Sequence, residues 1–168
     1  MTAQGARSNH KILRPEPDDH ALGRSRGGLS TKTHLSVDRR GRPLSIRLTA
    51  GQAGDNPQLR PLLGEIAVPA RGRGGRPRGR PECVIADKAY SHRSTRITLR
   101  NKGIRVVIPE KSDQVALRKA NGRAGGRPPT FDATTYRDRN VVERAFNRLK
   151  SWRGIATRYD KHARNYRA

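Results

Sequence analysis

Apolar and polar residues alternate in two neighbouring stretches of the chain, and this pattern predicts a β-hairpin. The apolar positions are Leu35, Val37, Leu44, Ile46 and Leu48. Alternation with a period of two places apolar side chains on one face of each strand. Residues 38–43 are turn formers, and we expect Asp38 to bond to its own backbone there. Residues 1–31 are polar and rich in proline and glycine, so we expect them to be irregular or disordered.

A helical spacing of apolar residues follows the hairpin. The positions are Leu59, Leu62, Leu63 and Ile66. Asp55-Asn56-Pro57 predicts the helix start, because Asp and Asn cap helices and proline suits the first turn. We expect the helix to end near Val68-Pro69. Residues 71–81 then form a basic low-complexity loop that either contacts phosphate or lies in solvent.

Two short apolar runs flank a helical segment in the middle of the chain. The unbroken run Cys83-Val84-Ile85-Ala86 is typical of a buried central strand, and it ends at Asp87. A helix follows and ends at Lys102-Gly103. Residues 105–109 form the second strand. The order of strand, helix and strand predicts an α/β sheet with helical cover.

A long helix is predicted for the C-terminal part of the chain, after a polar and glycine-rich loop at 111–130. It begins near Asp132 and runs towards residue 167, with Gly154 as a weak point. Its apolar stripe is formed by Val142, Ala145, Phe146, Leu149 and Trp152. The stripe indicates which side of the helix faces a core.

Beside this stripe stand Tyr136, Arg139, Glu143 and Lys150, separated by three, four and seven residues. At roughly 100° per residue these positions fall within a stripe about 60° wide. One helix face thus presents a carboxylate flanked by an arginine, a lysine and a phenol. Such a face suits holding a metal ion and a phosphate side by side. The simpler interpretation is a helix-surface glutamate among solvated charges, with Tyr136 packing on the helix start.

The charge of the chain points to a polyanionic partner. Its 168 residues suffice for one domain and contain 37 Lys and Arg against 14 Asp and Glu, a formal charge of +23. Nucleic acid is the commonest such partner. Aromatic residues make up only 4 % of the chain. Phosphate contact by arginine and lysine is therefore favoured over base stacking.

Several classes of protein are excluded or disfavoured by composition. The single cysteine, Cys83, allows neither an internal disulfide nor a thiolate metal cluster and fits a reducing cytoplasm. No apolar run approaches the roughly 20 residues that span a bilayer, so we expect no membrane association. The histidines show no metal-ligand spacing, and we assign them no role. They are His10, His20, His34, His92 and His162.

Asp87 and Glu143 are the candidate catalytic acids. Carboxylates at the ends of sheet strands are frequent ligand sites, although a lone Asp there is more often a cap or turn residue. Two carboxylates about one or two divalent ions can activate water for phosphodiester cleavage. Oxygen ligands suit Mg²⁺ or Mn²⁺ better than zinc. Lys88, next to Asp87, contacts phosphate or is solvated.

These residues carry a resemblance to a known family. Asp87-Lys88-Ala89-Tyr90 resembles the second box of bacterial insertion-sequence transposases of the DDE type. Tyr136, Arg139, Glu143 and Lys150 match the Y-x2-R-x3-E-x6-K signature of that group at every position. From about Asp18 onward the flanking sequence also resembles this family, in segments 23–32, 51–55, 125–129 and 156–161.

The resemblance implies a fold and a chemistry. The fold is RNase H-like, a mixed sheet flanked by helices, here expected within residues 32–168. The site has three carboxylates that hold two Mg²⁺ (or Mn²⁺) ions, which activate water and then the transposon's 3′-hydroxyl for attack on DNA phosphodiesters. On this basis Asp87 and Glu143 are the second and third acids, both catalytic and metal-binding. Arg139, Lys150, Tyr136 and Lys88 are implied to bind DNA or to order the site.

One departure from the family pattern matters for activity. The family's first Asp lies in an Asp-Ser-Thr stretch on a strand before the hairpin, and residues 3–7 resemble the tail of that region. We therefore expect the first strand and its Asp to be absent and the chain to be a C-terminal portion. Because one of three metal ligands is lost, we expect weakened metal binding and no activity of the portion alone.

Two hypotheses of different classes remain. The first is a DDE transposase portion that binds transposon ends and target DNA in a bacterial cytoplasm, at the nucleoid. A separately encoded N-terminal half is a further expected partner. The second is a non-catalytic basic nucleic-acid-binding protein, which would explain the charge but neither Asp87 nor the spacing around Glu143. The transposase hypothesis requires these two carboxylates to converge in space.

Overall fold

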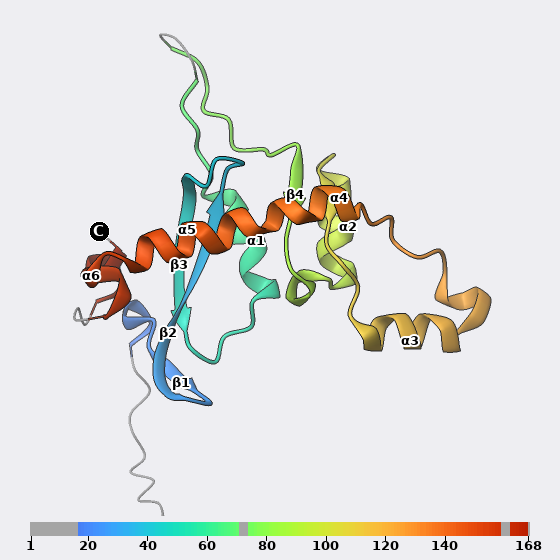
Figure 1. Cartoon of the computed structure of the whole chain (residues 1–168), viewed down its shortest axis with the longest axis horizontal. Coiled ribbons are helices and arrows are strands. Elements are labelled where there is room, and N and C mark those ends of the chain that lie inside the picture. Colours follow the sequence, from blue (N-terminus) through green and yellow to red (C-terminus); the bar gives the residue numbers. More distant parts are fainter. Residues whose placement is uncertain (1–16, 71–73, 159–161, 168) are drawn as a thin grey trace, which may run out of the picture.

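The computed structural model describes residues 17–70, 74–158 and 162–167. Its strands form a three-stranded antiparallel sheet and a separate two-stranded parallel sheet, with helices alongside both (Figure 1). The chain is therefore α/β, as the sequence predicts. A single mixed sheet is not observed in the described part, because the strands divide between two sheets. The expectations for 1–16, 71–73 and 159–161 lie outside the described residues.

The antiparallel sheet has the strand order β1 (Gly23–Ser25), β2 (Gly28–Val37) and β3 (Pro43–Ala50). The predicted hairpin is confirmed, and Asp38 Oδ1 accepts the backbone N–H groups of Arg40 and Arg42 at 2.9 Å each. The prediction of irregular structure up to residue 31 was wrong from Gly23 onward. The glycine-rich segment there forms the tight turn between β1 and β2, with Gly28 at φ +107°.

The helix after the hairpin is shorter than predicted. A 3-10 turn, η2 (Asn56–Gln58), leads into α1 (Leu59–Gly64). The predicted side-chain cap is not formed, because Asp55 makes no capping bond and Asn56 Oδ1 instead accepts the Thr95 hydroxyl at 2.8 Å. Residues 74–80 of the basic loop are all exposed and project away from the two sheets (Figure 1).

The predicted βαβ unit is confirmed. β4 (Cys83–Ile85) is followed by η3 (Lys88–Tyr90) and α2 (Arg93–Asn101), and β5 (Arg105–Val107) then pairs with β4 in parallel. Apolar residues from α1, β4, α2 and the ends of β5 form the core. They are Leu59, Val84, Leu99, Ile104 and Ile108. Among the described strands β4 pairs with β5 alone, so it does not occupy the predicted central position.

The predicted loop at 111–130 contains a helix, α3 (Ser112–Ala120), and a 3-10 turn, η4 (Gly122–Gly125). Polar contacts support this helix: the Lys111 N–H donates to Gln114 Oε1 at 3.3 Å, and Arg118 pairs with Glu110 at 2.7 Å. The only leucine of α3 is 64 % exposed. A helix without an apolar stripe gives no periodic signal, which explains why the pattern missed it.

The long C-terminal helix begins as predicted but is interrupted. Asp132 caps α4 (Ala133–Tyr136), accepting the Thr135 N–H at 2.9 Å, and η5 (Arg137–Arg139) leads into α5 (Asn140–Lys150). The chain then forms α6 (Arg153–Ala156) and α7 (Ala163–Arg167). Because α5 ends before Trp152, that side chain leaves the predicted stripe and is 72 % exposed. Ala145, by contrast, is buried.

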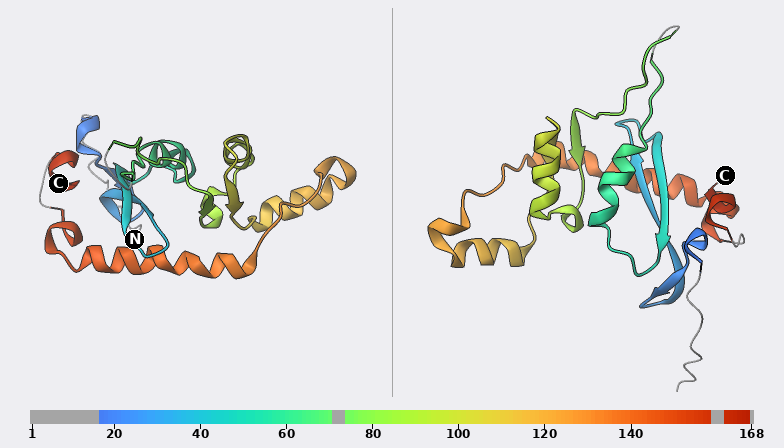
Figure 2. Two further views of the ribbon diagram at one scale, coloured as in Figure 1. Left: turned by 90° about the horizontal axis from the view of Figure 1, so that it is seen from above. Right: turned by 180° about the vertical axis from the view of Figure 1, so that it is seen from behind.

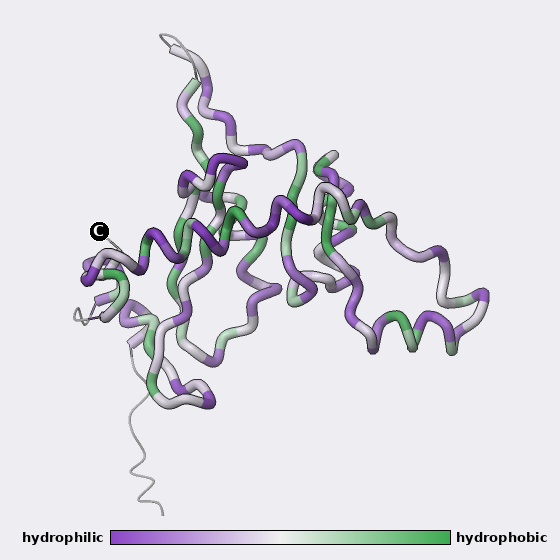
Figure 3. Tube along the Cα trace, in the orientation of Figure 1, coloured by the Kyte–Doolittle hydropathy of each residue, from purple (hydrophilic) through white to green (hydrophobic). Residues whose placement is uncertain are grey.

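α5 organises the molecule. It lies across one side of the β2–β3 hairpin, and α1 covers the other side (Figure 2). Apolar and polar segments alternate along α5, whereas β4 and β5 are mainly apolar (Figure 3). No helix in the described ranges has the length and apolar character needed to cross a bilayer. The hairpin, α1, β4 and α5 together enclose a cavity.

Candidate functional site

A cavity of about 340 Å³ lies between the hairpin, α1, β4 and α5, and three carboxylates line it, so we call it the acid cavity. Asp87 reaches it from the end of β4, Glu143 from α5 and Asp55 from the segment before η2. Much of the remaining lining is apolar. It includes Leu35, Leu59, Leu62, Val84 and Phe146. The structure therefore brings Asp87 and Glu143 to one cavity, while their catalytic and metal-binding roles stay predictions.

Asp87 is held by the backbone that follows it. Its Oδ1 accepts the Ala89 N–H at 2.8 Å, so the carboxylate caps η3. The alternative interpretation, a cap at the end of a strand, is thus confirmed. The cap also fixes the side chain against the cavity, because one oxygen is tied to the backbone. The two interpretations of Asp87 describe the same geometry.

Glu143 is held by the signature arginine. Arg139 Nη2 lies 2.5 Å from Glu143 Oε1, and the glutamate side chain is 53 % exposed. The Arg139 guanidinium carbon is 5.9 Å from the centre of the Tyr136 ring, which in turn lies 5.2 Å from the Phe131 ring. A ring, a cation and a carboxylate therefore follow one another along the predicted helix face. Tyr136 contacts Arg139, which lines the cavity, but is not itself among the lining residues.

The two lysines of the predicted site stand apart from the cavity. Lys150 is exposed in the last turn of α5, about 10 Å along the axis from Glu143 at 1.5 Å per residue. Lys88 is exposed on η3, beside Asp87. Neither lines the cavity.

The sequence predicts Asp55 only as part of a helix start, and its local pattern gives no sign that this residue lines the cavity. Its Oδ1 lies 3.2 Å from Lys32 Nζ and 3.8 Å from His34 Nδ1, and both partners come from β2. The only sequence signal was its place in the 51–55 segment of the family resemblance. Local pattern could not show that α1 packs across the hairpin and brings this segment beside β4.

His34 and Tyr90 are further cavity residues that sequence reasoning did not select. His34 is buried, and its Nε2 lies 2.8 Å from Thr49 Oγ1. Burial lowers the His34 pKa, Asp55 opposes this, and Lys32 and Arg47 add to the lowering. Burial, together with the charges of Asp55 and Asp87, raises the pKa of Tyr90 to about 12. The phenol thus stays protonated, and it interacts electrostatically with both acids.

A second cavity, of about 500 Å³, is lined almost entirely by arginine. Arg39 and Arg40 come from the hairpin turn, and Arg144 and Arg148 from α5, with Val141 between them. Arg148 Nη2 donates to the Gly41 carbonyl at 3.0 Å, and Arg39 pairs with Asp138 at 3.0 Å. We call these four residues the arginine cluster. Their convergence was not visible in the sequence.

Comparison with known proteins places the geometry in a family context. The family model described as "Transposase DDE domain" matches residues 9–168. The chain is 33 % identical over 150 residues to a Burkholderia cepacia protein named "Putative transposase for insertion sequence element IS402". It is 34 % identical over 133 residues to a Brucella ovis protein named "Putative transposase for insertion sequence element IS6501". No solved structure matches the chain significantly.

The matches differ in how much of each relative they span. The first covers 89 % of this chain but 62 % of its relative. The second covers 79 % of this chain and 85 % of its relative. Both matches extend over most of the chain described here.

Proposed function

Because the chain belongs to the DDE transposase family, we propose that it acts in DNA transposition. The chemistry we assign to its site is metal-dependent cleavage and transfer of DNA strands. The observation that carries this proposal is that Asp87, from the end of β4, and Glu143, from α5, line one cavity. We propose an RNase H-like arrangement for the fold, with β4, β5 and the hairpin as its strands and α5 as the helix that supplies Glu143.

The donor set of the cavity fits Mg²⁺ or Mn²⁺. Its candidate ligands are carboxylate oxygens, which hard divalent cations prefer. Asp87 uses one oxygen to accept the Ala89 N–H, and Glu143 uses one to meet Arg139. Each carboxylate keeps a second oxygen that could bind an ion. An ion bound there would supply Lewis-acid activation of an attacking oxygen.

The basic residues around the acids would position the DNA backbone. Arg139 holds Glu143 in place and offers its remaining N–H groups to a phosphate. Lys88 and Lys150, both exposed, would contact phosphates on either side of the cavity. Tyr136 supports Arg139 through its ring face. In this arrangement the lysines bind substrate, while Tyr136 is a positioning residue.

We propose that the chain alone does not cleave DNA. No Asp-Ser-Thr stretch of the kind that holds the family's first acid occurs in the sequence. Asp55 lines the same cavity, but it follows the hairpin, whereas the resemblance places the family's first Asp before it. With two of three acids the reacting groups are not held for in-line attack. A segment that supplies the missing acid, within a longer chain or in trans, would restore the site.

A nicking assay tests this function. Purified chain is incubated with supercoiled plasmid and Mg²⁺, with and without a co-purified N-terminal half of a related transposase. We expect no nicking by the chain alone and Mg²⁺-dependent nicking by the pair. Asp87→Ala should abolish the restored activity, whereas Asp113→Asn, on exposed α3, should not. Robust nicking by the chain alone that Asp87→Ala removes would overturn the proposed inactivity.

A non-catalytic nucleic-acid binder is the second candidate function. The observation that favours it is the arginine cluster, which lies apart from the acid cavity. This second function predicts DNA binding that does not depend on Asp87, on Glu143 or on divalent ions. Restored nicking that fails in Asp87→Ala would exclude it. The absence of nicking in every pairing, together with ion-independent DNA binding, would favour it.

A further inference from the structure

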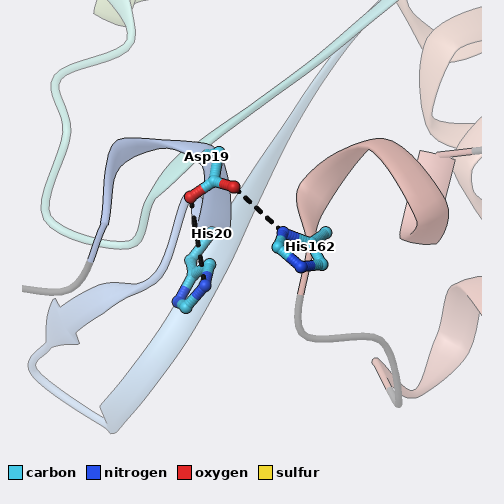
Figure 4. Close-up of side chains that lie close together, drawn as sticks. All are labelled: Asp19, His20 and His162. Atoms are coloured by element: carbon cyan, nitrogen blue, oxygen red, sulfur yellow. Dashed lines mark hydrogen bonds and ion pairs between the residues drawn. The ribbon is translucent and has the colours of Figure 1, made fainter.

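Three metal-ligand side chains from opposite ends of the described chain meet outside the acid cavity. Asp19 and His20 come from η1 (Asp18–His20), and His162 directly precedes α7. Their ligand atoms all lie within 4.8 Å of one another. The Asp19 carboxylate faces both imidazole rings (Figure 4), with Oδ2 at 2.9 Å from His162 Nδ1 and Oδ1 at 3.9 Å from His20 Nε2.

The backbone that carries these ligands is fixed by contacts of its own. Arg158 Nη2 donates to the His20 carbonyl at 2.5 Å, and its Nη1 donates to the Thr31 hydroxyl. Thr31 in turn donates to the Ala21 carbonyl at 2.8 Å. Ala21 has φ +48°, a conformation that a non-glycine residue keeps only where surrounding contacts impose it. These bonds fix the η1 side of the cluster against Arg158 and β2.

We propose that Asp19, His20 and His162 form a binding site for a divalent transition-metal ion of the Zn²⁺ class. Two imidazole nitrogens and one carboxylate oxygen are a donor set that Zn²⁺ prefers and Mg²⁺ does not. Zn–N and Zn–O bonds of about 2.0–2.2 Å separate neighbouring ligands in a tetrahedron by about 3.3 Å. One ligand atom from each residue lies within 4.8 Å of the other two, and the shortest pair, Asp19 Oδ2 and His162 Nδ1, is 2.9 Å apart. Water would complete the coordination.

The Asp19 carboxylate already contacts one of the two rings, with Oδ2 at 2.9 Å from His162 Nδ1. An ion bound here would replace the Asp19–His162 hydrogen bond by shared coordination and would tie η1 to α7.

This site is separate from the acid cavity. None of its three residues lines that cavity, and its nitrogen donors select different ions. The separation allows a test that distinguishes the two sites. Asp19 and His162 have side chains that are 63 % and 41 % exposed, so each can be replaced with little effect on packing. His20 is 7 % exposed in its side chain and is left intact.

The test is Zn²⁺ binding by the untagged full chain, measured by equilibrium dialysis and by thermal unfolding. The variants are Asp19→Asn and His162→Ala, with Asp87→Asn and His92→Gln as controls. Circular dichroism verifies that each variant is folded. We expect one Zn²⁺ per wild-type chain and a rise in Tm of about 5–10 °C at a hundredfold excess over Kd.

The outcomes separate cleanly. Affinity should fall at least tenfold in Asp19→Asn and in His162→Ala, and the Tm response should be lost in both, while both controls keep it. Three results would each overturn the proposal. They are no binding by the wild type, equal binding by all variants, and binding that Asp87→Asn removes but His162→Ala leaves intact.

Discussion

Asp87 and Glu143 each make a structural hydrogen bond and also line the acid cavity. Asp87 caps η3 and lines the cavity, and Glu143 accepts from Arg139 while facing the same space. Asp55 balances Lys32 and His34 beside them. Each bond uses part of a carboxylate and leaves the group oriented. In the proposed site, the local contacts that stabilise these residues would also hold them for binding an ion.

His34 makes the stability of the protein depend on pH. Its pKa in the folded state lies below the ordinary value of 6.5, mainly because the imidazole is buried. Below about pH 6.5 the unfolded chain therefore binds more protons than the folded one. The free energy of unfolding is fully retained above pH 6.5 and should fall as the pH decreases towards the folded pKa. Urea unfolding between pH 7 and 5 measures this.

His34→Gln should flatten that profile, because the variant has no imidazole to protonate. Thr49→Val is the matched control, since it removes the hydrogen-bond partner but keeps His34, and its profile should keep the wild-type slope. The carboxyl groups with lowered pKa titrate below 3.8, outside this window. Equal slopes for wild type and His34→Gln would refute the assignment.

At the residue scale, the sequence identifies residues whose local pattern is itself informative. Asp87 ends an apolar run, and Glu143 has a fixed offset from Arg139, so both could be selected. His34 and Asp55 could not, because each has a simpler local role in a strand or at a helix start. Their place at the cavity depends on how α1 packs against β2, which no local pattern encodes.

At the element scale, the hairpin and α5 are joined at the hairpin turn. Gly41 is buried there at φ +75°, and its carbonyl accepts from Arg148 on α5 at 3.0 Å. An added Cβ would lie 2.4 Å from Arg148 Nη2 and 3.3 Å from Val141 Cγ1. The turn thus needs glycine for its backbone conformation and for the close approach of α5.

Gly41→Ala should lower the free energy of unfolding by about 1–2 kcal/mol, because it places a side chain in the left-handed region. Loss of the Arg148 contact would add to this. The measurement is urea denaturation. Gly64→Ala, at the end of α1, is the control, since nothing lies within 4 Å of its added Cβ. A Gly41→Ala variant as stable as the Gly64→Ala control would contradict this account of the turn.

Elements with a clear period were predicted, and elements held by polar contacts were not. The hairpin, the βαβ unit and the start of the C-terminal helix all follow from apolar spacing. The helix α3 was missed because Gln114 and Arg118 support it rather than an apolar stripe. The break after α5 was also missed, since Ser151 and Trp152 have no strong breaking tendency.

At the scale of the whole molecule, net charge predicts a polyanionic partner but not where it binds. The arginine cluster forms only because α5 crosses the hairpin turn. Glu143, on the same helix, lines the acid cavity, so the acid cavity and the arginine cluster share α5. The division of strands between two sheets was likewise invisible in the sequence, because strand partners are chosen by tertiary packing.

DNA binding should weaken steeply with salt, and the arginine cluster should contribute to that dependence. Each phosphate contact contributes about 0.9 to the slope of log affinity against log salt. Arg40→Ala and Arg144→Ala should each reduce the slope by about 1, measured by fluorescence anisotropy with duplex DNA. Arg60→Ala is the control, because Arg60 is exposed on α1, on the other side of the hairpin. Equal slopes in all three variants would place the DNA elsewhere.

Mn²⁺ affinity in a double-mutant cycle tests most directly whether Asp87 and Glu143 share a divalent cation. Asp87→Asn, Glu143→Gln and the double variant are compared in a His162→Ala background, so that the η1–α7 site does not contribute. Asp113→Asn is the control. We predict a loss of at least tenfold in each single variant, about 1.4 kcal/mol, with little further loss in the double variant. Unchanged Mn²⁺ affinity in either single variant, or fully additive losses, would contradict a shared ion.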